Sequence, residues 1–319
     1  MGSPLLRIGT RGSPMALAQT HRVRDALRIA NPDLRQNDAI DIVVIQTTAD
    51  RAQDRTLAEI GGKGLFTKEI EEALLAGSID MAVHSMKDVP TWLPQGLEIA
   101  CLLERDDPRD AFISTRATSL AELPAGSVVG TASLRRQAQI LHKWPHLRVV
   151  PFRGNANTRL RKLEAGTVDA TLLALSGLER IGRTDAIAAV LPVEEMLPAV
   201  AQGALGIEIR SANDLARALL APLSHRSTEV CIAAERSLLA TLDGSCRTPI
   251  AGLGTLSADK TLTLRGLIAS SDGRTLWESC RSGPPSDATR LGADLGQELR
   301  RRAGPGLFVG EPGYPRSSL

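Results

Sequence analysis

Short apolar runs alternate with amphipathic stretches along the first two thirds of the chain. Apolar runs bounded by turn residues predict buried strands at residues 5–8, 41–46, 81–83, 111–114, 128–130, 147–150, 170–174 and 206–209. Helical periodicity and capping residues predict helices over residues 14–30, 67–76, 134–142 and 158–165. Because strands that alternate with helices usually pair in parallel, this order predicts α/β organisation with parallel sheets.

The pattern changes in the last third of the chain. A Pro-containing link at residues 221–224 predicts a domain boundary. Beyond it we expect two helices, at residues 228–242 and 288–302, and three strands, at residues 250–253, 261–269 and 276–280. These elements predict a small α+β domain, and a chain of 319 residues has room for two or three domains.

The most informative polar cluster follows the predicted strand at residues 81–83. Lys87 and Asp88 come soon after this strand, and Pro90 then interrupts regular structure. Because ligands of open α/β sheets usually bind beyond strand ends, Asp88 is a candidate for acid–base chemistry and Lys87 for holding an anion. The spacing alone leaves open the alternative of an ordinary Lys–Asp surface turn.

A second candidate anion site lies at the start of the first predicted helix. Ser13 and Pro14 have the residue types of an N-cap and a first helical position. Free backbone N–H groups at a helix start, together with Arg11 and Ser13, can bind an anion. The polar segment at residues 47–64 further along predicts a long functional or disordered loop.

Net charge is only +2, from 38 Lys and Arg against 36 Asp and Glu, but the charges are unevenly distributed. No carboxylate occurs between Glu122 and Glu164, whereas the same stretch carries eight cations: Arg135, Arg136, Lys143, Arg148, Arg153, Arg159, Arg161 and Lys162. A basic surface that faces only solvent usually contains acidic residues among the basic ones. Because this stretch has none, it predicts an anionic partner. Arg135 and Arg136 stand at a predicted helix N-terminus, where the helix dipole and guanidinium groups both favour carboxylates or phosphates.

Composition sets further bounds. With 43% hydrophobic and 23% charged residues, the chain is an ordinary globular protein. No apolar run approaches the length of a membrane span, and the N-terminus lacks a signal-peptide core. Four cysteines without a Cys-x-x-Cys pair argue against a disulfide framework and fit a reducing cytosol. We therefore expect a protein that does not enter a membrane and is either cytoplasmic or has lost a targeting segment.

Nucleic acid is the competing anionic partner. Single-strand binders need aromatic stacking platforms, yet aromatic residues make up only 3% of the chain, and no DNA- or RNA-binding signature is present. The glycines at residues 61–64 lack the spacing of a phosphate-binding P-loop. Pro145 separates His142 from His146, which disfavours a metal site on one helical face. We expect no nucleic acid, nucleotide or metal.

Among the cysteines, Cys246 stands out. It lies on a predicted loop between Gly244 and Pro249, next to Arg247, where exposure and a nearby cation favour the thiolate. A buried structural thiol is the ordinary alternative, and Cys231, inside a predicted helix, fits that description.

Five separate segments together resemble the porphobilinogen deaminase (hydroxymethylbilane synthase) family. They are GGKGLF at residues 61–66, VHSMKDVP at 83–90, GTASLRR at 130–136, RGNANTRL at 153–160 and DGSC at 243–246. The resemblance covers nearly the whole chain, in order and at matching spacing. Two departures affect loop conformation rather than chemistry: Ser245 stands where many members have glycine, and Ala156 where valine is frequent.

The resemblance implies a fold, a reaction and a cofactor. The fold is two periplasmic-binding-protein-like α/β domains facing a cleft, plus a C-terminal α+β domain. We expect them at residues 1–103 (completed by about 204–221), 104–203 and 224–319. The reaction is the condensation of four porphobilinogen molecules into hydroxymethylbilane with release of ammonia, by a transferase of tetrapyrrole biosynthesis. The cofactor is a dipyrromethane held by a thioether, and the protein is expected to be a monomer.

The family's functional residues carry over by position. The catalytic aspartate corresponds to Asp88 and the cofactor cysteine to Cys246. Cofactor-binding positions correspond to Lys87, Ser133, Arg135 and Arg136. Substrate-binding positions correspond to Arg11, Ser13, Gln19, Arg153, Arg159 and Arg180. Positions of a mobile loop correspond to Lys63 and Phe66.

The implied chemistry agrees with the charge distribution. Each pyrrole ring carries an acetate and a propionate, so a growing chain adds two negative charges per ring and needs many cations. A carboxylate near the pyrrole N–H groups can stabilise cationic intermediates and carry a proton, which is the role expected of Asp88. The alternative is a two-lobed binding protein for a small dicarboxylate, because fold alone does not separate these functions. A pure binder would need neither Cys246 nor Asp88.

Overall fold

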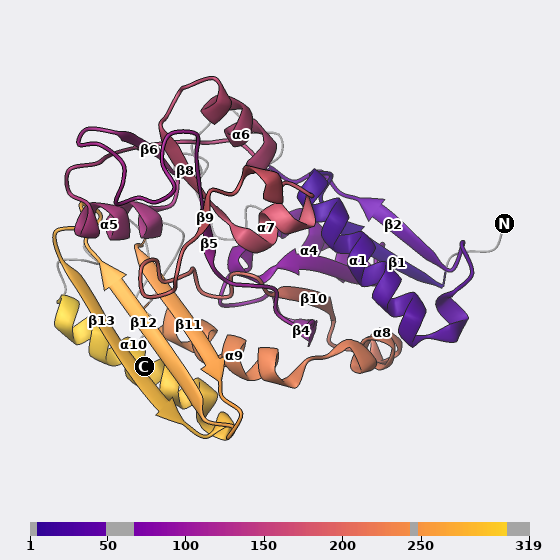
Figure 1. Ribbon diagram of the computed structural model, residues 1–319. Coiled ribbons are helices and arrows are strands. Elements are labelled where there is room, and N and C mark those ends of the chain that lie inside the picture. Colours follow the sequence, from indigo (N-terminus) through magenta and orange to yellow (C-terminus); the bar gives the residue numbers. More distant parts are fainter. Residues whose placement is uncertain (1–4, 49–66, 243–247, 305–319) are drawn as a thin grey trace.

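The computed structural model describes residues 5–48, 67–242 and 248–304. Within these residues the chain forms three β-sheets, each covered by helices (Figure 1). Two sheets have five strands and one has three. Most of the predicted loop at residues 47–64, together with Lys63, Phe66 and Cys246, lies outside the described residues.

The first sheet has the strand order β2-β1-β3-β10-β4. Its strands are β1 (Leu6–Thr10), β2 (Ile40–Val44), β3 (Met81–Ser85), β4 (Leu97–Leu102) and β10 (Leu205–Arg210). Successive side chains of a strand point to opposite faces. Accordingly, Met81 and Val83 pack in one core cluster with residues of α1 (Pro14–Ala30), and Ala82 packs in another with residues of α4 (Lys68–Leu75). The sheet is therefore buried on both faces.

The second sheet has the order β7-β6-β8-β5-β9. Its strands are β5 (Asp110–Ser114), β6 (Val128–Gly130), β7 (Arg148–Val150), β8 (Ala170–Ala174) and β9 (Ala189–Val190). The helices of this unit are α5 (Leu134–Lys143), α6 (Ala156–Glu164) and α7 (Leu175–Arg180). Ser133 and Asn155 cap α5 and α6, because their side chains accept hydrogen bonds from the N–H groups of Arg136 and Thr158.

The expectation of parallel sheets is only partly correct. β1 pairs in parallel with β2 and β3, and β6 pairs in parallel with β7 and β8. However, β10 runs antiparallel to β3 and β4, and β5 runs antiparallel to β8 and β9. β10 belongs to the first sheet although it follows every strand of the second sheet in the chain. Apolar periodicity could not predict its direction, because it carries no information on strand direction. Among the described α-helices and β-strands, four were not predicted: β4, α7, β9 and α8 (Asp214–Leu220).

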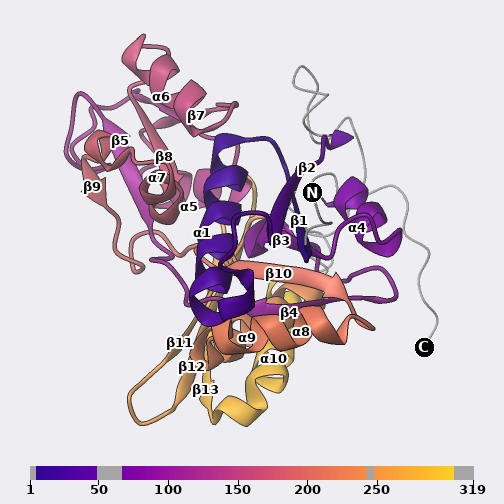
Figure 2. The same cartoon turned by 90° about the vertical axis from the view of Figure 1, so that its right-hand side faces the viewer.

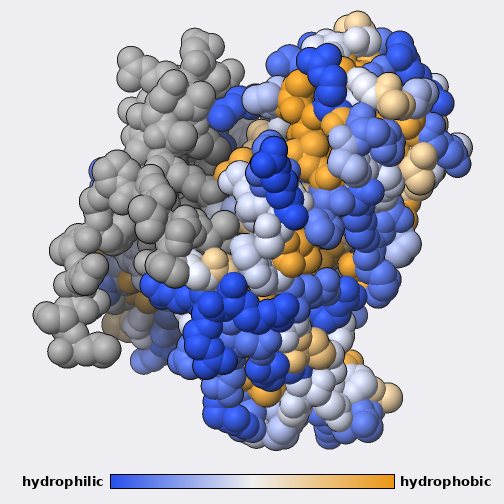
Figure 3. Space-filling model, turned by 90° about the vertical axis from the view of Figure 1, so that its left-hand side faces the viewer, coloured by the Kyte–Doolittle hydropathy of each residue, from blue (hydrophilic) through white to orange (hydrophobic). Residues whose placement is uncertain are grey.

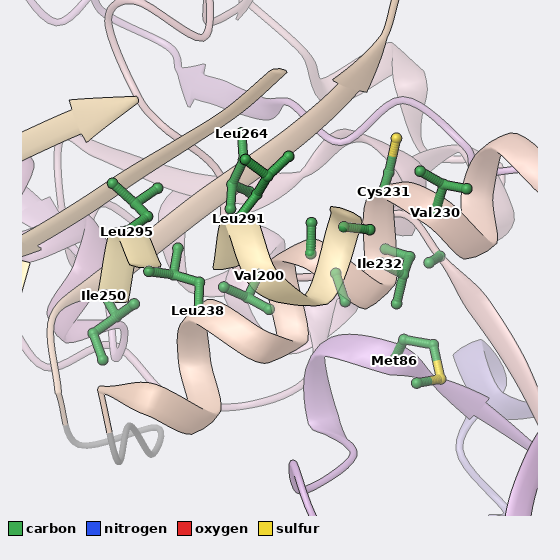
Figure 4. Packing of buried hydrophobic residues seen from close by; sticks show 14 of the residues in the cluster. Met86, Val200, Val230, Cys231, Ile232, Leu238, Ile250, Leu264, Leu291 and Leu295 are labelled. Atoms are coloured by element: carbon green, nitrogen blue, oxygen red, sulfur yellow. The ribbon is translucent and has the colours of Figure 1, made fainter. Parts of the chain in front are cut away.

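The C-terminal unit is an antiparallel sheet covered by two helices. β11 (Ile250–Leu256), β12 (Leu262–Ala269) and β13 (Leu276–Gly283) pair in sequence order, and α9 (Arg226–Thr241) packs against α10 (Ala288–Ala303). Leu238 of α9 and Leu291 of α10 lie in the core of this unit (Figure 4). The same core cluster includes Met86 and Val200 from outside the unit, so this core continues beyond the C-terminal unit (Figure 4). Figure 2 shows the three strands of the unit below β10 and β4 of the first sheet. The predicted fold class, two α/β domains and an α+β domain, is confirmed.

Both segments that connect the first two sheets are bound to α9 through Glu235, which is fully buried. Its carboxylate accepts hydrogen bonds from Arg105 at 2.5 and 3.1 Å and from the backbone N–H of Ala201 at 2.6 Å. Ala201 has a left-handed backbone with φ of 60°, a strained conformation for a residue with a side chain. The residue two positions later, Gly203, must be glycine, because a Cβ there would lie 2.4 Å from the carbonyl oxygen of Asp106. These contacts hold the two segments that connect the first and second sheets in one backbone arrangement.

Polar residues dominate much of the described surface. On the face shown in Figure 3, hydrophilic residues predominate in the lower half, and apolar residues show between polar ones in the upper half. None of the helices in the described part of the chain is both long enough and apolar enough to span a lipid bilayer.

Candidate active site

Asp88 and Lys87 are presented by a short turn at the end of β3. The strand ends at Ser85, and residues Met86–Asp88 form one turn of 3₁₀-helix before Pro90. Met86 and Val89 are buried on either side of the two charged residues, which are themselves exposed. The apolar positions anchor the turn while the charged positions face outward. The structure therefore places Asp88 at a strand end, as the sequence predicts.

Lys87 interacts with charges of the second unit. Burial among protein atoms lowers its pKa to about 8; Asp88 and Asp110 act in the opposite direction, while Arg136 and Arg135 lower it further. Part of the residue still reaches solvent, which weakens the penalty on the charged form. An anion bound here would restore a higher pKa, so the surroundings of Lys87 favour binding of a carboxylate.

Arg135 and Arg136 are buried side by side at the start of α5. Arg135 Nη2 lies 2.8 Å from one carboxylate oxygen of Asp110, and Arg136 Nη2 lies 2.7 Å from the other. Gln202 donates a further hydrogen bond to Asp110 at 2.8 Å. Burial alone would raise the pKa of Asp110, but the two arginines and these hydrogen bonds outweigh it and lower the pKa below its ordinary range.

This pairing corrects one inference from the sequence. The stretch between Glu122 and Glu164 lacks acids, yet Asp110, at the first position of β5, supplies a carboxylate to both arginines in space. Two guanidinium groups facing one carboxylate still leave an excess of positive charge. In addition, the Nε atoms of Arg135 and Arg136 are buried and have no hydrogen-bond partner in the described part of the chain. Unsatisfied buried donors of this kind call for an acceptor.

Arg153 and Arg159 extend the positive region along the second unit. Arg159 donates from Nε to the carbonyl oxygen of Gly154 at 2.8 Å, and Arg153 is exposed. Burial, followed by repulsion from Arg136 and Arg153, lowers the pKa of Arg159 to about 10. Among the described residues, neither Arg153 nor Arg159 forms an ion pair with an acid. No acid of the described residues therefore neutralises either charge.

The N-terminal candidates have structural partners as well. Ser13 caps α1 by accepting a hydrogen bond from the N–H of Ala16 at 3.2 Å, which confirms the predicted N-cap. Buried Gln19 donates from Nε2 to the hydroxyl of Ser85 at 2.8 Å and so ties α1 to the end of β3. Arg11, half-buried, precedes this helix. Gln19 thus lies next to the turn that carries Asp88.

Arg180 is engaged elsewhere. It lies at the end of α7 and binds Asp106 through Nε and Nη2 at 2.9 and 2.6 Å, and the carbonyl oxygen of Gly203 at 2.7 Å. Asp106 also pairs with Arg22 of α1 at 2.6 Å. Arg180 therefore joins the two segments that connect the first and second sheets. Its expected role in substrate binding stays a prediction.

Three candidates, Lys63, Phe66 and Cys246, lie outside the described residues. Conversely, Asp110, Gln202 and Arg236 were missed. Asp110 follows five charged residues and a proline at 104–109, where nothing in the local sequence marks it as buried. Arg236 lies within a regular helical pattern and binds backbone carbonyls far away in sequence.

Lys87 of the first unit interacts electrostatically with Arg135 and Arg136 of the second, beside the exposed Asp88. The fold and these residues define an α/β protein with a cationic candidate site where two units join. Comparison with known proteins gives the family. Residues 6–218 match the family model for the porphobilinogen deaminase dipyrromethane cofactor binding domain, and residues 229–301 match the model for the porphobilinogen deaminase C-terminal domain. The chain belongs to the porphobilinogen deaminase family, and the predicted resemblance is confirmed.

Relatives match over almost the full length. The chain is 57% identical to the chloroplastic porphobilinogen deaminase of Oryza sativa over 95% of this chain and 86% of the relative. It is 55% identical to the porphobilinogen deaminase of Nitrobacter hamburgensis over 96% of both chains. Among solved structures, a periplasmic substrate-binding protein of an ABC transporter from Coxiella burnetii has a TM-score of 0.42 at 15% identity, over 68% of this chain and 91% of that chain. Family membership makes this chain a transferase of tetrapyrrole biosynthesis rather than a dicarboxylate-binding protein.

Proposed function

We propose that this chain condenses four porphobilinogen molecules stepwise into hydroxymethylbilane, releases one ammonia at each step, and uses Asp88 as its catalytic carboxylate. The observation that carries the proposal is the position of Asp88 at the end of β3, next to Lys87, whose electrostatic neighbours are the arginines of α5. Ammonia release and product formation on addition of porphobilinogen test it directly.

Asp88 would act on nitrogen-centred cations. Loss of ammonia from the substrate's aminomethyl group leaves the methylene carbon on the ring as an electrophile, with the positive charge stabilised by the pyrrole nitrogen. An exposed carboxylate that makes no hydrogen bond or ion pair within the described part of the chain keeps both oxygens available to that N–H. It can stabilise the cation and accept or return a proton.

Porphobilinogen carries an acetate and a propionate, and these groups need cations. Arg153 and Arg159 fit this role because Arg159 is repelled by both Arg153 and Arg136. A carboxylate between them would relieve that repulsion and form charge-assisted hydrogen bonds. We propose Arg11, Ser13, Gln19 and Arg180 as further substrate-binding residues, with Lys63 and Phe66 in a mobile loop.

The residues present fit a dipyrromethane cofactor. The buried, unpartnered Nε atoms of Arg135 and Arg136 lack acceptors, and the surroundings of Lys87 favour an anion. We propose that Lys87, Ser133, Arg135 and Arg136 hold the cofactor's acidic side chains and that Cys246 forms the thioether. When bound, the cofactor supplies a nucleophilic pyrrole carbon as primer. The protein's residues would neutralise the cofactor's carboxylates and hold its pyrrole rings in a fixed position relative to Asp88.

We further propose domain boundaries at residues 1–103 with about 204–221, at 104–203 and at 224–319. The sheet order supports this, because β10 returns to the first sheet after the second is complete. A cytoplasmic location is supported by Cys101, Cys231 and Cys280, which are free thiols as expected in a reducing compartment. We also propose that the protein is a monomer, which light scattering tests.

A further inference from the structure

Arg236 reaches out of the C-terminal unit to the turn that carries Asp88. It lies in α9, and its Nη1 and Nη2 atoms donate hydrogen bonds to the carbonyl oxygens of Val89 and Pro90 at 3.1 and 2.6 Å. These two carbonyls belong to the residues directly after Asp88. The planar guanidinium thus holds two successive peptide groups at once, which a point charge such as lysine cannot do equally well.

The charge of Arg236 has no carboxylate to balance it among the described residues. Burial lowers its pKa, and no neighbouring acid offsets that shift. The adjacent Glu235 is already occupied by Arg105, by the N–H of Ala201 and by the N–H of Gly254. Removing a cation from water without a counter-ion is costly, so the two carbonyl contacts are the interactions that retain it in this position.

The position of Asp88 depends on the backbone that carries it. Within the described part of the chain its carboxylate makes no hydrogen bond or ion pair that would fix the side chain. The part of the turn before Asp88 is held by the hydrogen bond from Met86 N–H to the carbonyl oxygen of Ala204 at 3.0 Å. Met86 also packs in the core cluster that contains Ile232 and Leu238 of α9 (Figure 4). After Asp88, Arg236 supplies the polar contacts to the backbone.

We infer that Arg236 is a positioning residue: it fixes the carbonyl side of the Asp88 turn against α9 and thereby sets where the Asp88 carboxylate meets the pyrrole nitrogen. This inference rests on the proposed function of Asp88. It also links two parts of the reaction, because α9 ends at Thr241, five residues before Cys246 in the sequence. One helix then supports the catalytic turn and leads into the segment with the cofactor cysteine.

The test compares Arg236→Met and Arg236→Lys with Arg226→Met as a matched control on the same helix. Arg226 is the first residue of α9, is exposed, and its side chain forms an ion pair only with Glu229 among the described residues. Misplacement of a catalytic group by about 1 Å costs up to about 100-fold in rate. We expect kcat per mole of holoenzyme, counted by intact mass, to fall about 10- to 100-fold in Arg236→Met with KM changed less than about threefold. Arg236→Lys should recover part of the loss, and Arg226→Met should equal the wild type.

A merely structural role would lower the melting temperature and holoenzyme yield but leave kcat per holoenzyme unchanged. That result in Arg236→Met, with an active wild type, overturns the inference. If Arg236→Met does not fold, Arg236→Lys is the deciding variant. Its kcat should still fall measurably below that of Arg226→Met. Equal kcat values for these two variants would contradict the inference. Absence of ammonia release by the wild type and by Arg226→Met would instead contradict the proposed function, so the two failures are distinguishable.

Discussion

The carboxylate of Asp110 lies 2.7 Å from Arg136 and, through its other oxygen, 2.8 Å from Arg135. Because all three side chains are buried, removing the one negative charge leaves two guanidinium groups without a counter-ion. We expect Asp110→Asn to destabilise the protein by about 3 to 5 kcal/mol and to reduce holoenzyme formation. Urea unfolding and intact mass measure the two effects. Asp185→Asn, which alters an exposed pair with Arg183, should change stability by less than about 0.5 kcal/mol.

The lowered pKa of Lys87 predicts that the rate of cofactor assembly depends on pH. Its pKa of about 8 lies below the ordinary value of 10.5, so its charge is complete well below pH 8 and is lost as pH rises through that value. Cofactor assembly by apoprotein incubated with porphobilinogen should therefore slow above about pH 8. Lys87→Arg keeps its charge throughout, so assembly in this variant should lack the decline. The same decline in Lys87→Arg would show that another group is responsible.

Cys246 predicts a covalent adduct. Freshly purified active protein should be heavier than its sequence by one dipyrromethane, and Cys246→Ala should have the sequence mass. Intact-protein mass spectrometry measures both. An active wild type with only the sequence mass would contradict the cofactor assignment.

Arg153 and Arg159 predict a loss of substrate affinity without a loss of fold, because neither forms an ion pair with an acid of the described chain. Loss of one charge-assisted hydrogen bond costs about 1.5 to 3 kcal/mol, which corresponds to roughly 10- to 150-fold in KM. Arg→Leu at either position should raise KM by this amount and leave the melting temperature nearly unchanged. Arg148→Leu, an exposed cation of β7, is the control and should behave as wild type. Equal KM in all three variants would show that this region is only solvated.

Local signals explain what the sequence predicts well. The placement of Asp88 follows from an apolar run, a polar cluster and Pro90 within ten residues. The Ser13 cap and its helix follow from an equally short signal, and α1 begins at Pro14 as predicted. Such features depend on neighbours in sequence, where propensity and capping act.

Tertiary contacts explain the rest. Asp110 meets Arg135 and Arg136 because β5 lies in the same sheet as the strand that leads into α5, over separations of 25 and 26 residues. Arg236 contacts Val89 across 147 residues. The antiparallel insertion of β10 between β3 and β4 is likewise a property of the assembled sheet. Hydrophobic periodicity specifies none of these partners, whereas the matched family segments indicate the site as a whole.

The central claim, that Asp88 stabilises cationic pyrrole intermediates and transfers a proton, is tested most directly by the turnover of Asp88→Asn. Asparagine keeps the shape but carries no charge and accepts no proton. We expect ammonia release to fall at least about 10² to 10³-fold, with the circular dichroism spectrum unchanged and substrate binding largely retained through the arginines. Asp88→Glu should retain more activity than Asp88→Asn because its charge remains. Near-normal turnover by a folded Asp88→Asn variant would contradict the account and remove Asp88 from the mechanism.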